Sequence, residues 1–273
     1  MIKHTIKLFL EYNRAVTRQV LRQKDPSNFR VKFMYESKEF VDHYIPELKL
    51  QPPEAKILEE LKTELPKFKM LDIGVGAGRT TRHFAELAKE YIGIDYSSSM
   101  IEACRIKFPK YRLEVADARN LNIFEDSYFD FVLFSFNGID AVDHEDRITI
   151  LHEIRRIIRK GGYFCFSTLN LRSRRLRPPF TFYRNPFLMS FGVYNFLLNS
   201  NMRKNRKQEH ELVFLKYRDF LTRLYFISPS EQLKQLKETG FSNTKAYGLN
   251  NGKIVSDPAK ALDYYVYFLT TAN

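Results

Sequence analysis

Cysteine is scarce in this chain, and long apolar runs are missing. Cys104 and Cys165 are the only cysteines in 273 residues, so the chain cannot build a disulfide framework or a four-thiolate zinc site, and we predict no metal site. Both lie in apolar runs, as expected of reduced, buried thiols. No segment reaches the roughly 18 strongly apolar residues that span a bilayer, and charged residues interrupt the N-terminus, which therefore lacks the apolar core of a secretory signal. These absences predict a cytoplasmic protein.

The net charge of +12 is concentrated in one segment. Residues 171–225 carry 12 Lys and Arg against 3 Asp and Glu, whereas residues 51–170 carry 17 against 19. A local excess of positive charge indicates a local role, such as binding an anionic ligand or surface, rather than a generally basic protein that coats nucleic acid. The composition, 44% hydrophobic and 28% charged, is typical of a folded protein.

Short apolar runs alternate with helical patterns through the middle of the chain. This alternation predicts βαβ units, a mostly parallel sheet and helices on both of its faces. We divide the chain into an N-terminal helical cap (1–50), a core (51–170), a basic, aromatic-rich insertion (171–225) and a C-terminal part that completes the sheet (226–273). The expected strands are 68–73, 91–95, 111–115, 129–135, 163–168 and 263–270, and the expected helices include 55–65, 80–90, 98–107, 146–159 and 229–238.

A glycine-rich turn follows the first expected strand. Residues 71–80 read LDIGVGAGRT, with glycine at positions 74, 76 and 78 and a helix expected directly afterwards. Without Cβ atoms the backbone can turn tightly and approach a ligand closely. In an open parallel sheet such a turn lies at the carboxyl edge of the strands, where ligands bind.

Two carboxylates follow the next two strands. Asp95 ends the second strand, 21 residues after Gly74, a distance at which its side chain can accept hydrogen bonds from both hydroxyls of a ribose. Asp117 and Ala118 follow the third strand, where a carboxylate and the next backbone N–H can together recognise adenine. The three features predict a nucleoside site. Arg79 occupies the position of the third glycine of a dinucleotide motif, which disfavours a pyrophosphate ligand, and no P-loop sequence follows.

These stretches, with 129–137 and 151–168, resemble successive motifs of class I S-adenosylmethionine-dependent methyltransferases, in particular small-molecule and quinone methyltransferase-like domains. The resemblance covers about residues 50–170 and continues more weakly at 228–241. It implies a Rossmann-like, seven-stranded, mostly parallel α/β sheet with an antiparallel last strand, and S-adenosyl-L-methionine as cofactor. By the same analogy, the methionine portion of the cofactor is surrounded by Asp72, Gly74, Gly76 and Gly78, and its ribose is held by Asp95. The adenine is flanked by Tyr96 and Met100, and its edge is recognised by Asp117 and Ala118. The sulfonium lies beside Ser135, Phe136 and Asn137, and Tyr35 folds over the cofactor.

Methyl transfer from a sulfonium is an in-line displacement that depends mainly on proximity and on exclusion of water. A base helps only where the acceptor is a hydroxyl or a protonated amine. His144 and Asp140, in the loop after the fourth strand, are the candidate catalytic residues by position; a solvated polar loop is the alternative interpretation.

The insertion admits three interpretations. It forms a lid whose aromatic residues enclose a small acceptor, or it follows a nucleic-acid backbone through Arg203–Lys207, or residues 187–198 form an interfacial helix on anionic lipid. We favour the lid and a small, anionic or aromatic acceptor methylated at O or N, because residues 135–138 depart from the motif used on exocyclic base amines. RNA or lipid methylation, a non-catalytic cofactor-binding protein and NAD-dependent redox chemistry are the alternatives; the sequence does not predict the oligomeric state.

Overall fold

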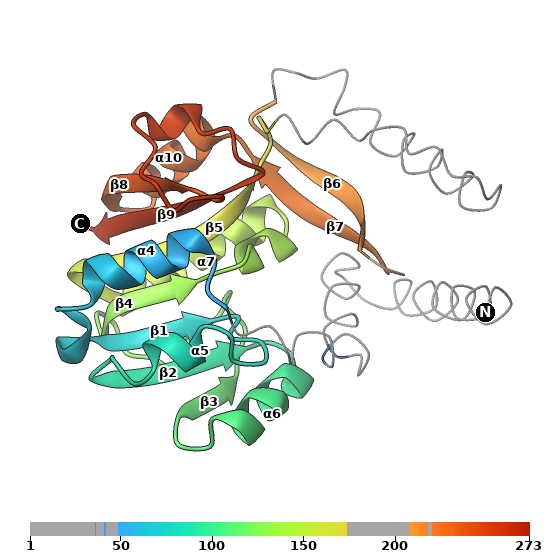
Figure 1. The fold of residues 1–273 in the computed structure, drawn as a ribbon. Helices are drawn as coiled ribbons and strands as arrows, with labels where there is room; N and C mark the ends of the chain where they lie inside the picture. Colours follow the sequence, from blue (N-terminus) through green and yellow to red (C-terminus); the bar gives the residue numbers. More distant parts are fainter. Residues whose placement is uncertain (1–35, 37–40, 42–48, 174–207, 218–219) are drawn as a thin grey trace, which may run out of the picture.

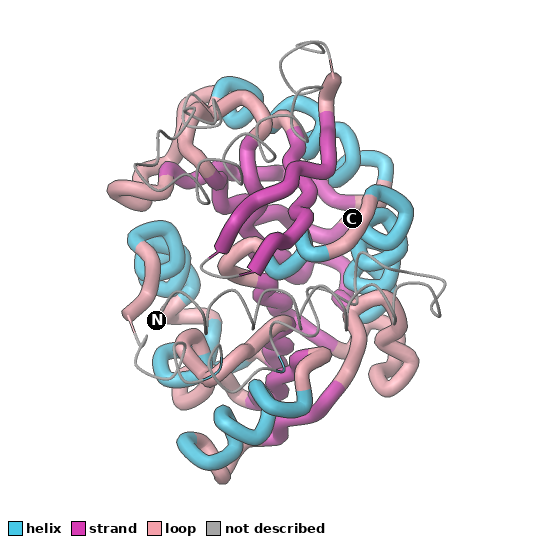
Figure 2. The backbone as a smooth tube through the Cα atoms, turned by 90° about the vertical axis from the view of Figure 1, so that its right-hand side faces the viewer, coloured by secondary structure: helices cyan, strands magenta, loops and turns pink. Residues whose placement is uncertain are grey.

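The computed structural model describes residues 36, 41, 49–173, 208–217 and 220–273. These residues form a single branched sheet with helices on both of its faces (Figures 1 and 2). The strands are β1 (Lys69–Ile73), β2 (Glu90–Asp95), β3 (Arg112–Val115), β4 (Phe129–Phe134), β5 (Ile158–Asn170), β6 (His210–Tyr217), β7 (Phe220–Ile227), β8 (Phe241–Gly248) and β9 (Tyr265–Ala272). The helices are α4 (Pro52–Leu61), α5 (Thr81–Phe84), α6 (Ser98–Lys107), α7 (His144–Ile157) and α10 (Pro229–Glu238), with 3-10 turns η1 (Leu65–Lys67), η2 (Gly138–Ala141) and η4 (Pro258–Lys260).

The central sheet has the order β3-β2-β1-β4-β5-β9-β8. The first five of these strands are parallel, with Met70 of β1 opposite Tyr91 of β2 on one side and Phe131 of β4 on the other. β9 runs antiparallel between β5 and β8. The Rossmann-like, mostly parallel sheet with an antiparallel last strand is thereby confirmed, and its parallel strands end together at one edge.

A hairpin of β6 and β7 adds two further strands that the sequence analysis did not predict. β7 pairs with the end of β5 only through Leu169 opposite Phe226 and Asn170 opposite Ile227, so most of the hairpin extends past the end of β5 (Figure 1). Its charged residues, Lys216 and Arg223 among them, interrupt the alternation of apolar and polar residues that predicts a strand, and the sequence analysis therefore assigns the segment to the basic insertion. Residues 174–207, with the expected interfacial helix and the Arg203–Lys207 cluster, lie outside the described residues.

The helix expected over residues 80–90 is much shorter in the structure. α5 ends at Phe84, and the chain continues in turns because the amides of Lys89 and Glu90 bond to the carbonyls of Leu65 and Phe68, which directs the backbone into β2. β8 was also not predicted, whereas α6 and α10 have the predicted bounds.

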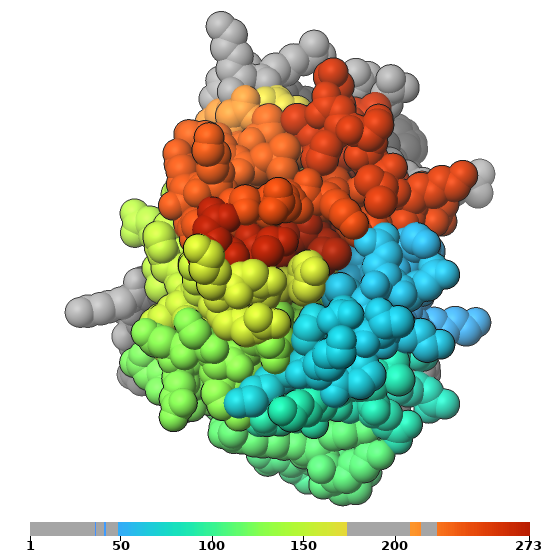
Figure 3. Space-filling model, turned by 90° about the vertical axis from the view of Figure 1, so that its left-hand side faces the viewer, coloured from blue at the N-terminus to red at the C-terminus, as the bar shows by residue number. Residues whose placement is uncertain are grey.

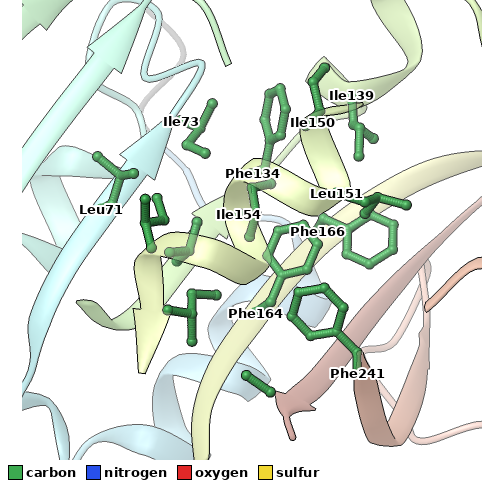
Figure 4. Close-up of a cluster of buried hydrophobic side chains, with 14 of the residues drawn as sticks. Leu71, Ile73, Phe134, Ile139, Ile150, Leu151, Ile154, Phe164, Phe166 and Phe241 are labelled. Atoms are coloured by element: carbon green, nitrogen blue, oxygen red, sulfur yellow. The ribbon is translucent and has the colours of Figure 1, made fainter. Parts of the chain in front are cut away.

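Two large hydrophobic clusters of described residues lie on opposite faces of the sheet, and a smaller one joins β5 to the hairpin. Successive residues of β1 alternate between the two large clusters, with Leu71 and Ile73 on one face and Met70 on the other. The first cluster contains Ile150, Leu151, Ile154, Phe164 and Phe241, which bring together α7, β5 and β8 (Figure 4). Full burial of each such side chain contributes about 1.5–3 kcal/mol. This packing fixes the strand ends that carry the site.

The segment that begins at α4 lies beside the C-terminal strands (Figures 1 and 3). Glu60 of α4 accepts a hydrogen bond from Tyr247 at 2.9 Å and pairs with Lys245 at 3.1 Å, both on β8. α4 is therefore held against the far end of the sheet. In the part of the chain that the structure describes, no helix is both long and apolar enough to cross a bilayer.

Candidate functional site

The glycine-rich loop after β1 has the backbone that its sequence predicts. Gly74, Gly76 and Gly78 all have positive φ, at 67°, 55° and 90°. A Cβ on Gly76 would meet no atom within 4 Å, whereas a Cβ on Gly78 would lie 2.4 Å from the ring of Phe108 and 3.0 Å from Sγ of Cys104. Gly76 thus borders open space, as a close approach by a ligand requires, while Gly78 lets the loop pack against α6.

The carboxylate of Asp95 joins the end of β2 to this loop. It accepts the backbone N–H of Gly76 at 2.9 Å and that of Ser97 at 2.9 Å. Burial raises the pKa of Asp95 to about 6, although both backbone donors oppose the shift. The fold therefore holds a desolvated carboxylate beside the open glycine, the arrangement that a pair of ribose hydroxyls needs.

Asp72 lies behind the loop. Its carboxylate accepts hydrogen bonds from Thr80 Oγ1 at 2.5 Å and Tyr91 Oη at 2.8 Å, and burial raises its pKa to about 7. These bonds connect the two ends of the glycine loop to β2. In the structure Asp72 braces the loop, and the surface of the loop is provided by the glycines.

The residues expected around an adenine lie on neighbouring elements. Tyr96 is partly buried at the start of the turn into α6, and Met100 is fully buried on that helix. Asp117 accepts hydrogen bonds from the side chain of Arg119, which also pairs with Asp146 of α7 at 2.8 Å. Ala118, the next residue, packs against the core. Tyr35, expected above the cofactor, lies outside the described residues.

A buried ion pair that the sequence analysis did not predict lies beside the loop. Glu54 of α4 is 1% exposed and accepts hydrogen bonds from both terminal nitrogens of Arg79, from Ser135 Oγ and from Tyr267 Oη at 3.1 Å. The pair joins α4 to the loop, the end of β4 and β9. Glu54 and Arg79 are 25 residues apart, and the sequence signalled Arg79 only as the residue that breaks a dinucleotide motif.

The end of β4 has an unusual backbone. Phe136 and Asn137 have φ of 54° and 62°, the left-handed region that residues other than glycine seldom adopt. Ser135 is held by Glu54, and the amide of Asn137 donates to Ser167 Oγ of β5 at 2.8 Å. All three residues expected beside the sulfonium therefore lie at the edge of the sheet that carries the glycine loop.

The two candidate bases belong to a polar cluster between η2, α7 and the hairpin. Asp140 is fully buried and accepts from Arg147 at 2.6 Å, from Thr168 Oγ1 at 2.6 Å and from the amide of Leu169 at 2.7 Å. Burial raises the pKa of Asp140 to about 6. With its oxygens engaged and no exposed surface, this carboxylate supports the loop and is not placed to contact an acceptor.

His144, the first residue of α7, is the more accessible candidate. Its Nδ1 lies 2.7 Å from Tyr225 Oη, and its ring stacks on His210 with centroids 4.3 Å apart. Both partners come from the unpredicted hairpin, so the sequence analysis could identify His144 but not its surroundings. The structure therefore separates the proposed site residues into a group around the glycine loop and β4, and a second group on the α7 side.

Comparisons with known proteins agree with this geometry. Residues 70–162 match a family described as "Methyltransferase domain". An uncharacterised protein of Methanocaldococcus jannaschii is 27% identical over 190 residues, 69% of this chain and 72% of that protein. The demethylmenaquinone methyltransferase of Thermotoga maritima is 28% identical over 191 residues, 68% of this chain and 75% of that protein.

A similar fold occurs in the crystal structure of 1,6-didemethyltoxoflavin-N1-methyltransferase from Burkholderia thailandensis, which contains S-adenosylhomocysteine. The two chains are 16% identical, with a TM-score of 0.57, and the match covers 90% of this chain and 88% of the other. The open face at Gly76, the buried carboxylate of Asp95 and the order of the strands are all consistent with the family match. Residues 70–162 therefore match a methyltransferase domain, and the sheet has the fold that this methyltransferase also has.

Proposed function

We propose that this protein transfers the methyl group of S-adenosylmethionine to an oxygen or nitrogen atom of a small, anionic or aromatic acceptor. The step is a displacement in line with the C–S bond: a lone pair of the acceptor forms the new bond to the methyl carbon, the carbon–sulfur bond breaks, and S-adenosylhomocysteine leaves. The open face at Gly76 and the carboxylate of Asp95 support the cofactor half of this proposal.

The proposal of a small acceptor rests mainly on one observation: described arginines near the strand ends are already paired with carboxylates. Each has a carboxylate partner: Arg79 pairs with Glu54, Arg119 with Asp117 and Asp146, Arg147 with Asp140, and Arg172 with Glu209. A nucleic-acid backbone is bound by cations that exchange counterions for phosphates. Arginines already neutralised by neighbours contribute little to such binding, so this part of the site favours a small acceptor over a polymer.

A hydroxyl acceptor needs a base, and His144 is our candidate. It can accept a proton at Nε2 only in the tautomer whose Nδ1–H donates to Tyr225 Oη. A neutral amine needs no base, because it loses its proton to solvent after transfer. Replacing His144 with Gln should therefore slow transfer to a hydroxyl acceptor and spare transfer to a neutral amine.

The test uses the full chain with S-adenosylmethionine labelled at its methyl group. One arm offers a set of small aromatic and acidic hydroxyl and amine compounds, a second offers RNA, and a third offers anionic lipid vesicles. We expect label on a small compound and one S-adenosylhomocysteine formed per methyl transferred, with Asp95→Asn reduced and the surface control Asp126→Asn unchanged. Label only on RNA or lipid would overturn the proposal, as would tight cofactor binding without transfer in any arm.

A further inference from the structure

One aromatic side chain stands apart from all others in the described part of the chain. Phe136 is 39% exposed, and every other Phe or Tyr whose side chain the structure describes is buried or partly buried. The remaining large exposed apolar residues are aliphatic and lie elsewhere: Ile106, Val115, Ile123, Ile254 and Leu262. Phe136 instead follows the end of β4, at the edge of the sheet that carries the glycine loop and where an open parallel sheet binds ligands, so its exposed ring is a candidate ligand contact.

The backbone holds this ring in a conformation that costs free energy. Left-handed φ at a bulky residue is unfavourable and persists only where the surroundings impose it. Here they do: Ser135 is tied to Glu54, the amide of Asn137 is tied to Ser167, and Gly138 packs so tightly that an added Cβ would lie 2.3 Å from the ring of Phe134. Such strain is typical of functional sites.

Two described side chains flank the ring of Phe136, and part of the ring stays exposed. The guanidinium of Arg79 lies over the ring, 5.2 Å from its centroid, and Tyr265 packs edge-on at 6.3 Å with an interplanar angle of 65°. Because Glu54 neutralises Arg79, the charge is not available to attract an anion strongly. What remains exposed is an aromatic surface, and aromatic surfaces favour planar rings.

Asn137 places an unsatisfied hydrogen-bond acceptor next to Phe136. Its Oδ1 is buried and has no hydrogen-bond partner in the structure. An unsatisfied buried oxygen is costly, and a ligand that carries N–H or O–H can satisfy it. A stacking surface and an unsatisfied hydrogen-bond acceptor on adjacent residues are therefore complementary to a planar aromatic ring that carries an N–H or O–H group.

We propose that Phe136 and Tyr265 form a stacking platform for a planar aromatic acceptor, and that the carboxamide of Asn137 receives a hydrogen bond from an N–H or O–H on its ring. This inference rests on the proposed function, whose acceptor class it narrows. It makes Phe136 and Asn137 determinants of acceptor specificity in addition to neighbours of the cofactor.

The chain has no tryptophan, so excitation at a wavelength that its 16 tyrosines absorb weakly reports the fluorescence of an indole probe with little contribution from the protein. The full chain is saturated with S-adenosylhomocysteine and titrated with indole and with 1-methylindole, which lacks the N–H. Phe136→Gly removes the ring and suits the positive φ, so it should fold; Phe136→Tyr keeps the ring. Asn137→Gly removes the carboxamide, again at a position that glycine tolerates, and Ile123→Ala is the control for loss of an exposed apolar side chain.

We expect Phe136→Gly to weaken indole binding about three- to tenfold, with no change in Phe136→Tyr or Ile123→Ala. Asn137→Gly should abolish the preference for indole over 1-methylindole. Equal indole affinity in wild type and Phe136→Gly, or no binding to wild type, overturns the platform. Calorimetry with S-adenosylhomocysteine on the same samples separates this failure from that of the proposed function, since cofactor binding and methyl transfer can persist without the platform.

Discussion

Gly76 and Gly78 occupy the same loop, yet their missing Cβ atoms have different consequences. Alanine at Gly76 meets open space and should cost only about 1 kcal/mol for its positive φ, while it should obstruct the cofactor. Alanine at Gly78 collides with Phe108 and should add about 1–3 kcal/mol of overpacking. We expect Gly76→Ala to lose affinity for S-adenosylhomocysteine and Gly78→Ala to lose chiefly stability, measured by calorimetry and urea unfolding. The reverse pattern would contradict the assignment of Gly76 to the ligand face.

We expect the ionisation of Asp95 to make cofactor binding depend on pH. Because burial raises its folded pKa from 3.8 to about 6, this group destabilises the free fold as pH rises from about 4 to 6, the range in which the carboxyl of the unfolded chain is ionised while the buried carboxyl still holds its proton. Hydroxyl groups of a ribose bind best to the ionised form. Affinity for S-adenosylhomocysteine should therefore fall by up to about tenfold per pH unit below about 6.

Asp95→Asn separates this effect from other titrations. The variant should bind more weakly at pH 7, by roughly 10–100-fold for a charge-assisted pair of hydrogen bonds, and should show no decline below pH 6. A decline that remained in the variant would assign the pH dependence to another group, with Asp72, whose pKa is about 7, as the first candidate.

At the scale of elements, Arg147 joins parts of the fold that are distant in sequence. Fully buried on α7, it donates to the carbonyl of Ile139, to Asp140, to Thr168 of β5 and to Gln232 of α10. Arg147→Met would leave Asp140 buried without its cation, and we expect a loss of about 3–5 kcal/mol in the free energy of unfolding.

Two further variants test that reasoning by urea denaturation. Adding Asp140→Asn to Arg147→Met should recover about 1–3 kcal/mol, because the unpaired charge is removed as well. Arg156→Met, which breaks a more exposed pair with Asp126 and Glu153 on the same helix, should cost at most about 1 kcal/mol. Equal costs for the two arginines would show that burial of Arg147 is not what makes it important.

Elements with strong local signals could be predicted from the sequence. α6 and α10 begin after serine caps, and α10 also begins with proline; these signals lie within a few residues of one another. The β6–β7 hairpin and the short α5 could not be predicted, since each depends on pairing with residues far along the chain. The same limit applies to Glu54 and Arg79, whose interaction exists only because α4 packs beside β1 and β9.

At the scale of the whole molecule, the candidate site also has one part that could be predicted from the sequence and another that could not. The glycine loop and Asp95 were predictable because a parallel sheet brings successive strand ends to one edge. Asp140 had a suitable position in the sequence, but only the fold could reveal that Arg147 and Thr168 enclose it. Position after a strand identifies an edge of the sheet; it does not tell whether a side chain there faces the ligand or the interior.

The uneven charge distribution gives the last test. Eight Lys and Arg and no Asp or Glu lie in residues 174–207, while the described arginines at the strand ends are paired. If the acceptor is small and bound on the aromatic surface, its KM should stay nearly constant as salt is raised, because stacking does not release counterions. Replacing Arg203, Lys204, Arg206 and Lys207 with Gln should then leave transfer to the small acceptor unchanged. A polymer that contacted six or more phosphates would instead lose about three to five decades of affinity between low and moderate salt, and the quadruple variant would flatten that dependence.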